Sequence, residues 1–496
     1  MDDARTVTSN NGGAAPARTD RRRWAALVVL CVGQLMIVLD VTVVNVALPT
    51  IQRELHFSQN SLAWVVNAYL LTFGGLLLLA GRLGDIVGRK RIFLAGVASF
   101  VVASAMCGFA NSDAFLIAAR FVQGAAAAFM ASMILGIIAT TFGPHERGKA
   151  MSVYAFVASS GGSIGLLVGG LLTELLNWHW IFFINVPIGI ATLVLAQMLI
   201  EDTPGLGLAR GVDVGGAVLA VAAPTVAVWA IVHASEWGWT SATTLGMFAL
   251  ALALVGAFLF LESRLRNPLM PLSVFESRTR NVANAVRALF AVGLFGAFFM
   301  SALYFQLVLG YSAITVGLAF LPLNLTIGVF SLGIAARVMS RVGPKRELVA
   351  GLALAVVALL LFARMPVGGS YVVDILPAML VFGLAAGLSF TPGVALSMAE
   401  AGPSNSGVAS GLANVTLQLG AALGLAVLAS VSTQLTNRRL AQGASKASAL
   451  TAGYHVAFLI GAGCLAMAVL LASTLLRRNI SLGPPSEERK AELAAA

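Results

Sequence analysis

Long apolar stretches recur along the chain from Trp24 to Arg477, and they limit what it can fold into. Many of them reach the roughly 20 residues that a helix needs to cross the hydrocarbon core of a bilayer. Short polar connections separate them. The 496 residues are 58% hydrophobic and only 10% charged, whereas soluble domains have about 25% charged residues. The sequence therefore predicts an all-α protein that crosses a membrane many times.

The apolar stretches give fourteen predicted spans. They lie near residues 24–47, 61–80, 92–110, 114–140, 150–176, 180–200, 213–233, 242–262, 282–308, 314–336, 347–364, 372–397, 405–433 and 453–476. Because this number is even, both termini are expected on one side of the membrane. None of the three cysteines, Cys31, Cys107 and Cys464, indicates a disulfide framework, since all fall inside spans.

Lys and Arg are concentrated in alternate connections. One set holds Arg82, Arg89, Lys90, Arg91, Arg147, Lys149, Arg210, Arg264, Arg266, Arg278, Arg280, Arg341, Lys345 and Arg346. The opposite set holds little more than Arg53 before the basic segment 436–446. Such an asymmetry places the basic loops in the cytoplasm. We therefore expect a multi-pass membrane protein with both termini cytoplasmic. The same asymmetry accounts for the net charge of +10 without a nucleic-acid partner.

An internal repeat divides the chain. The segment 81–96 aligns without gaps to 336–351, with seven of sixteen residues identical, and the same shift of 255 carries Gly165 to Gly420 and Gly169 to Gly424. Parallel repeats of this kind are common in transporters. We expect six-helix bundles at 24–200 and 282–476, with an inserted transmembrane hairpin at 201–263 between them. A cytoplasmic linker follows at 264–281, with a disordered cytoplasmic tail at 1–23 and a second tail at 477–496.

Asp40 in the first predicted span and Arg120 in the fourth lie at similar expected depths. A charge near the middle of a bilayer costs roughly 2.5–3.5 kcal/mol even on a lenient scale, so such residues are functional candidates. A static ion pair between two spans is the alternative. Gln123, one turn after Arg120, could hold either partner by a hydrogen bond. If Asp40 functions in coupling, a proton from outside would neutralise it and favour a closed, inward-facing form.

Glycines are regularly spaced in two spans. Gly161, Gly165 and Gly169 form a GxxxGxxxG pattern in the fifth predicted span, and Gly420 and Gly424 occupy related positions in the thirteenth. Such spacing lets another helix approach closely. The alternative to generic packing is that these helices bend or slide during transport.

The ninth predicted span is rich in aromatic residues and methionine, which suit large apolar ligands of varied shape. Lipid-facing phenylalanine is the alternative interpretation. The candidate substrate-binding residues are Asn45, Gln123, Asn185, Phe295, Phe299, Tyr304, Gln306, Asn414 and Gln418.

The sequence gives little support for nucleotide binding, metal binding or catalysis. The segment "GPHERGKA" nearly spells a phosphate-binding loop, but Ala150 lacks the hydroxyl that would meet magnesium, and no strand precedes it. An ion gradient rather than ATP is therefore expected to drive the protein. We also expect no metal site, no organic cofactor and no enzymatic activity, because no HExxH motif or nucleophile elbow is present.

Together these motifs resemble the drug:proton antiporters with fourteen spans in the major facilitator superfamily. Asp40 and Asn45 match the family's first-span motif in "LDVTVVNVALPTI", and Arg120 matches its fourth-span motif in "ARFVQG". The loop signature "GRLGDIVGRK" aligns as well, and its matching residues are Gly81, Asp85, Gly88, Arg89 and Lys90. The resemblance implies that this loop acts as a cytoplasmic latch and that Arg120 takes part in proton coupling.

The chain departs from the family pattern at two places. Leu166 follows Gly165 where the fifth-span motif usually has proline, and Ser340 replaces the loop acid in the second half. The first departure weakens the inference of antiport from that motif, and the second weakens any latch in the second half.

The resemblance implies a major facilitator fold and proton-coupled export of amphipathic drugs or dyes by alternating access. Asp40 would carry the proton, Arg120 would modulate it, and protons would be the coupling ion. The expected partners are small amphipathic molecules and the lipid bilayer, and the expected state is a monomer. Alternatives are a dedicated exporter of one natural product, a proton-coupled importer, and, from another class, a membrane receptor or enzyme.

Overall fold

The computed structural model describes residues 16–58, 61–202, 205, 207, 213–265, 268–399 and 406–476, which form helices and no strand. In the first part of the chain these are α1 (Pro16–Glu54), α2 (Trp64–Val87), α3 (Arg89–Gly108), α4 (Asp113–Thr141), α5 (Pro144–Leu175), α6 (Trp180–Phe183) and α7 (Asn185–Leu199). Next come α8 (Val214–Trp237) and α9 (Ala242–Arg264). The last part contains α10 (Arg278–Leu307), α11 (Ala313–Ala319), α12 (Leu321–Val329), α13 (Ala335–Val342), α14 (Pro344–Phe362), α15 (Leu376–Ser397), α16 (Ser406–Ala441) and α17 (Lys446–Leu475). Short 3₁₀ turns at Ser61–Ala63 and Leu272–Glu276 and π turns at Phe330–Ile334 and Tyr371–Ile375 join some of them.

Eleven of the described helices are long and apolar enough to cross a membrane. The other three predicted spans fall on α5, on the run α11–α13 and on α14. A π turn at Phe330–Ile334 interrupts the second of these. The first turn of α14 contains Lys345, Arg346 and Glu347, so its charge is high for a span. The multi-pass α-helical class is confirmed, and the number fourteen stays a prediction. The predicted tails fall largely outside the described residues.

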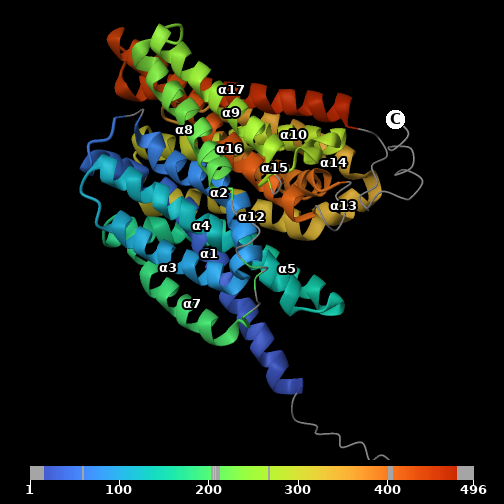
Figure 1. Cartoon of the computed structure of the whole chain (residues 1–496). Helices are drawn as coiled ribbons and strands as arrows, with labels where there is room; N and C mark the ends of the chain where they lie inside the picture. The colour runs from blue at the N-terminus through green and yellow to red at the C-terminus, as the bar shows by residue number, and fades with distance from the viewer. Residues whose placement is uncertain are drawn as a thin grey trace, which may run out of the picture.

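The helices pack in two groups (Figure 1). In the first group α1 packs against α4, α5 and α7, while α4 packs against α2 and α3. In the second group α10 packs against α15, α16 and α17, while α14 packs against α15 and α17. The groups meet where α2 lies against α16 and where α5 lies against α11 and α12. From the hairpin, α8 contacts both α2 and α16, so it covers one of these junctions.

The internal repeat is visible in the backbone. α2 ends before Gly88 and α3 begins after it, and α13 and α14 flank Gly343 in the same way, 255 residues later. Both glycines have a positive φ, 113° at Gly88 and 86° at Gly343. This conformation is unfavourable for residues with a Cβ. The same turn therefore joins the second and third helices of each half.

The spaced glycines lie where helices approach closely. A Cβ at Gly161, Gly165 or Gly169 of α5 would meet α1, and one at Gly420 or Gly424 of α16 would meet α10. The fifth helix of each half thus lies against the first. Leu166, where the family has proline, keeps its backbone N–H, and α5 is one helix from Pro144 to Leu175.

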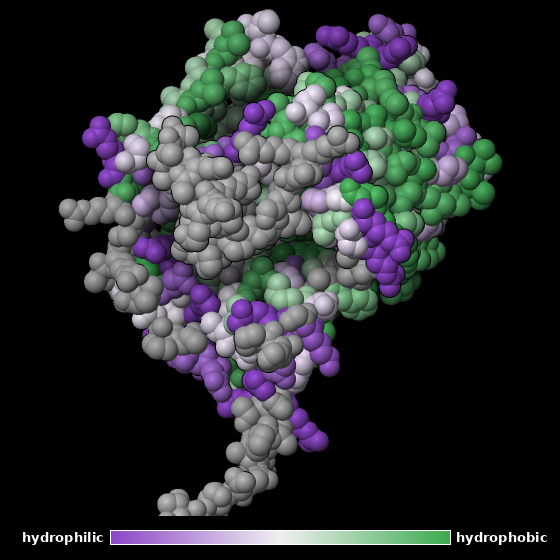
Figure 2. All heavy atoms as spheres, turned by 90° about the vertical axis from the view of Figure 1, so that its right-hand side faces the viewer, coloured by the Kyte–Doolittle hydropathy of each residue, from purple (hydrophilic) through white to green (hydrophobic). Residues whose placement is uncertain are grey.

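We call the end of the bundle where α1 and α3 begin the basic end, and the opposite end the far end. At the far end the two groups are in contact, because Gly170 and Leu166 of α5 lie against Ala313 and Gly317 of α11. Figure 2 views the molecule from the side on which α5 and α13 lie in Figure 1. The surface there is hollowed between two lobes, and hydrophobic atoms are visible in the hollow.

Candidate functional site

Asp40 and Arg120 form a buried ion pair. Arg120 Nη1 donates to Asp40 Oδ2 at 2.5 Å, and the two side chains are 0–1% exposed. Arg120 Nε also donates to the carbonyl oxygen of Val65 on α2 at 2.9 Å. The expectation that the two charges lie at one depth is therefore correct. They lie inside the first helix group, so neither charge is accessible to solvent in this conformation.

Gln123 joins both members of the pair. Its Nε2 donates to Asp40 Oδ1 at 2.7 Å, and its Oε1 accepts from Arg120 Nη1 at 2.7 Å. The amide also donates to Ser104 Oγ of α3 at 3.0 Å, and Asn185 Nδ2 of α7 donates to the same hydroxyl at 3.1 Å. We call Asp40, Arg120, Gln123, Ser104 and Asn185 the charge cluster. It joins α1, α3, α4 and α7.

Aromatic rings cover the guanidinium. The Cζ atom of Arg120 lies 4.4 Å from the ring centre of Tyr69 and 5.9 Å from that of Phe182. Cation–π contacts of this kind strengthen where water is excluded. Tyr69 is fully buried on α2, and its hydroxyl has no hydrogen-bond partner. Breaking a buried pair by removing one charge is strongly destabilising. Asp40 can thus change its charge only if the cluster opens or Arg120 is stabilised in another way.

Two of the predicted substrate-binding residues, Gln123 and Asn185, are members of this cluster. Sequence reasoning missed Ser104, which holds both amides, and the covering position of Tyr69. Ser104 is a single small hydroxyl in a span, and no pattern in the sequence distinguishes it from an ordinary packing residue.

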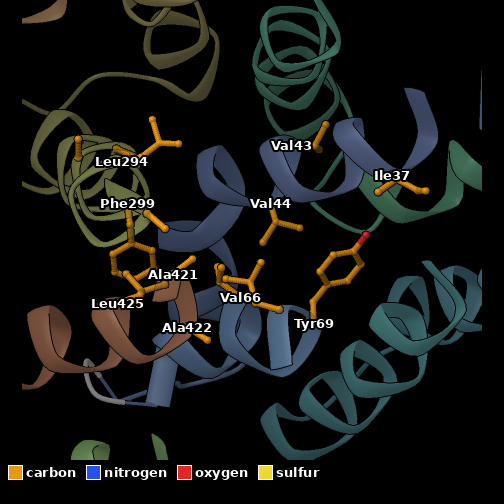
Figure 3. Close-up of a cluster of buried hydrophobic side chains, with 14 of the residues drawn as sticks. Ile37, Val43, Val44, Val66, Tyr69, Leu294, Phe299, Ala421, Ala422 and Leu425 are labelled. Carbon is orange, nitrogen blue, oxygen red and sulfur yellow. The ribbon is translucent and has the colours of Figure 1, made fainter. Parts of the chain in front are cut away.

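Phe299 lies in an apolar seam between the two helix groups. Figure 3 shows it with Leu294 of α10 on one side and Ala421 and Leu425 of α16 below, and Val44 and Val66 of the first group nearby. Phe299 is 2% exposed. Phe295, one turn earlier on α10, is partly buried. The seam is apolar on both sides, so the helix groups can separate here without breaking a charge pair.

The polar candidates are mostly bonded to backbone. Asn45 Nδ2 donates to the Val41 carbonyl and Asn414 Nδ2 to that of Ser410, each within its own helix. Gln306 Nε2 of α10 donates to the Val46 carbonyl of α1 at 2.7 Å. The Tyr304 hydroxyl donates to the Pro366 carbonyl at 2.5 Å. Gln418 is buried, and its Cβ packs near Gly74 of α2. Gln306 and Gln418 therefore lie at junctions between the helix groups.

The loop signature makes its described contacts inside the first helix group. Arg89 pairs with Asp85 at 3.2 Å and donates to the Gly136 carbonyl of α4 at 2.8 Å. Lys90 Nζ donates to the Gln197 carbonyl near the end of α7 at 2.9 Å. Gly88 supplies the turn. A Cβ added to Gly81 would have no other atom within 4 Å. The pairing of the loop acid with a basic group is present, and a role as latch stays a prediction.

Two repeated helix groups, a glycine turn common to both and a buried charge cluster are now established. The sequence matches the Major Facilitator Superfamily over residues 30–425. The chain belongs to this superfamily. As a major facilitator transporter it is a multi-pass membrane protein, which confirms the fold class and the resemblance found in the sequence.

Several relatives of this transporter confer antibiotic resistance or export antibiotics. It is 39% identical to the puromycin resistance protein pur8 of Streptomyces alboniger, with 93% of each chain covered. It is 37% identical to the cephamycin export protein CmcT of Amycolatopsis lactamdurans, covering 86% of this chain and 89% of that one. Among solved structures, an auto-inhibited peptide transporter of the POT family has a TM-score of 0.66 at 16% identity, covering 94% of this chain and 99% of that one. That likeness shows the shared fold.

Proposed function

We propose that this transporter exports amphipathic drugs or dyes in exchange for protons by alternating access. The observation that carries the proposal is the buried charge cluster around Asp40, because a carboxylate held at 0–1% exposure in a cluster that joins four helices needs a reason to be there. Relatives of this chain are resistance and export proteins, which supports the direction of transport.

In the proposed cycle Asp40 alternates between an ion pair and a neutral acid. When the transporter opens to the outside, a proton binds the Asp40 carboxylate and gives a carboxylic acid, which ends the ion pair with Arg120. Arg120 keeps its bonds to Val65 and Gln123 and its contact with Tyr69. The membrane potential contributes about 2.3 kcal/mol per charge per 100 mV. When the transporter opens inward, the proton leaves and the pair re-forms as in the present structure.

The apolar seam around Phe299 supports amphipathic substrates, since aromatic surfaces accept apolar molecules of varied shape. We favour lipophilic monocations and zwitterionic antibiotics. A dedicated exporter of one natural product is the second candidate, because each relative named above is linked to one antibiotic. A broad panel of compounds separates the two. Import is disfavoured, and the direction of counterflow tests it.

The orientation, coupling ion and assembly belong to the same proposal. The Arg and Lys residues at the basic end support a cytoplasmic location for that end, and we propose that both termini lie there in a bacterial inner membrane. Protons are the coupling ion, small amphipathic molecules and lipid are the partners, and the working unit is a monomer. The proposed exporter carries out no covalent chemistry.

The test is ethidium uptake by inside-out vesicles under an imposed proton gradient. Wild type is expected to accumulate the dye, and Asp40→Asn is expected to lose uptake while still binding it. The matched control is Asp113→Asn, an exposed acid at the far-end start of α4. If Asp40→Asn transports as well as wild type, Asp40 is structural and the proposal is wrong.

A further inference from the structure

The second helix group contains two buried charges that the proposed function does not use. Arg287 on α10 is 5% exposed, and Glu347 on α14 is 1% exposed. Neither Glu347 oxygen has a hydrogen-bond partner, and Arg287 Nε has none. Asn284, one turn before Arg287, also has an amide without partners. Among the described residues, no ion pair includes Arg287 or Glu347.

Arg287 contacts a glycine of α15, and Glu347 lies at the level of the same glycine. A Cβ built on Gly393 would lie 3.9 Å from Arg287 Nη1, so the guanidinium lies against this glycine. On the other side, Gly351 of α14 packs against Ser389 and Ala385 of α15. The consecutive helices α14 and α15 run in opposite directions. The residue one turn before Gly351 therefore lies opposite the residue one turn after Ser389. Glu347 is therefore level with Gly393.

A small cavity next to Arg287 adjoins a proline inside α15. Arg287, Leu348, Ser389 and Gly393 line a cavity of about 10 Å³, at the lower limit for one water molecule. Pro392, inside α15, has no N–H to continue the helical ladder, and proline is a common origin of kinks. A glycine follows it directly. A change of angle at Pro392 and Gly393 would thus alter the gap between Arg287 and Glu347.

A buried carboxylate without hydrogen bonds or a cation is unfavourable, whereas the protonated acid carries no charge to desolvate. A buried guanidinium cannot lose its proton in this way, because arginine stays charged. We propose that Glu347 is a second proton-binding group of the transporter, and that Arg287 becomes its partner when it is ionised. Glu347 is a neutral acid in the present conformation. In the alternate conformation it releases its proton, and the carboxylate pairs with the guanidinium.

The charges around Glu347 favour release once α15 moves. α10 contributes Arg280 and Arg287, and α13 contributes Arg337 and Arg341. Lys345 and Arg346 precede Glu347 on its own helix, and Lys345 donates to the Leu476 carbonyl. Arg280 donates to the carbonyls of Val274 and Ala399. The described residues of α15 include no charged side chain, and α17 has none at this end. Among the described residues, the charged side chains of these helices at this end are therefore all basic, and no acid there opposes ionisation of Glu347.

The test is infrared difference spectroscopy of the purified transporter over a pH titration. A protonated buried carboxyl has a carbonyl band that shifts in D₂O. Wild type is expected to show this band, Glu347→Gln to lose it, and Asp40→Asn to keep it. Asp374→Asn is the matched control, because Asp374 is an acid of the same helix group at the far end. If the band persists in Glu347→Gln, the proposal is wrong.

Arg287→Met tests the pairing. Without the guanidinium the carboxylate loses its partner, so the band should persist to a pH at least one unit higher, a tenfold change in proton affinity. An unchanged midpoint would show that Arg287 is not the partner. The coupling of Glu347 to transport rests on the proposed function. The infrared band of the protonated Glu347 carboxyl does not depend on that function. A wild-type band together with absent ethidium transport would contradict proton-driven export and leave Glu347 as a proton site.

Discussion

Arg120 Nη1 donates both to Asp40 Oδ2 and to Gln123 Oε1, and Gln123 Nε2 closes the triangle by donating to Asp40 Oδ1. Eighty positions separate Asp40 from Arg120 in the sequence. Every side of the triangle is a direct bond, so the pair needs no water to be satisfied. Because the pair is also buried, a proton can reach Asp40 only when the helices around it move apart.

Gln123→Leu tests the triangle. Leucine has a similar size, but it leaves Asp40 Oδ1 and Ser104 without this donor, and the cost of an unsatisfied buried group is about 1–3 kcal/mol. We expect a lower melting temperature in detergent and slower ethidium transport. Gln442→Leu, at an exposed position after α16, is the control. Equal melting temperatures for the two variants would show that Gln123 contributes no net stability.

The junction at the far end supplies a second prediction. Gln306 Nε2 donates to the Val46 carbonyl at 2.7 Å, and Glu174 of α5 accepts from the Ile314 N–H of α11 at 3.0 Å. Both bonds join the two helix groups. A hydrogen bond contributes about 0.5–1.5 kcal/mol, so Gln306→Leu should shift the equilibrium several-fold toward a form open at the far end.

Spin labels in place of Leu175 and Leu318 measure this shift, because both residues are exposed and lie on α5 and α11. We expect a larger population of long distances in Gln306→Leu and in Glu174→Gln. Glu236→Gln, an exposed acid near the end of α8, is the control. Distance distributions identical to wild type would contradict a gating role for these bonds.

Close helix approach in the second group gives a third prediction. A Cβ on Gly420 would lie 2.6–3.0 Å from backbone atoms of Ala288, which cannot rotate away. Gly420→Val should therefore separate α16 from α10 and destabilise the protein by about 1–3 kcal/mol. The control is Gly463→Val on α17, where no atom lies within 4 Å of a built Cβ. The measurement is thermal unfolding of the two variants. An equal loss of stability in both would exclude close helix approach as the cause.

The sequence predicted the multi-pass helical class, the repeat and the meeting of Asp40 with Arg120, because each leaves a pattern along the chain. Similar depth in two spans and a spacing of one turn were enough to place Gln123. The rotation of a helix about its axis is harder to predict when apolar residues surround it on all sides. The position of Asn185 in the charge cluster was therefore not predicted, and its role in substrate binding stays a prediction.

Arg287 and Glu347 were overlooked for a related reason. Both lie near the start of predicted spans, where long charged side chains usually extend to the membrane surface. In the structure both residues lie inside helices, because α10 begins four residues before the predicted span, at Arg278, and α14 begins three residues before it, at Pro344. Hydropathy places a boundary only approximately, and burial near a boundary depends on which helices pack there.

The repeated turn provides the last prediction. Gly88 and Gly343 have ψ values of 131° and 155° with positive φ, close to a region that is essentially restricted to glycine and costs other residues of order 1–3 kcal/mol. If the halves share this turn, Gly88→Ala and Gly343→Ala should destabilise the protein by similar amounts, measured by thermal unfolding. Gly81→Ala is the control, since Gly81 is helical, has free space around it and should gain stability from alanine. Tolerance of alanine at one of the two turns would mean that the backbone there can relax, and that the repeat does not extend to the conformation of the turn.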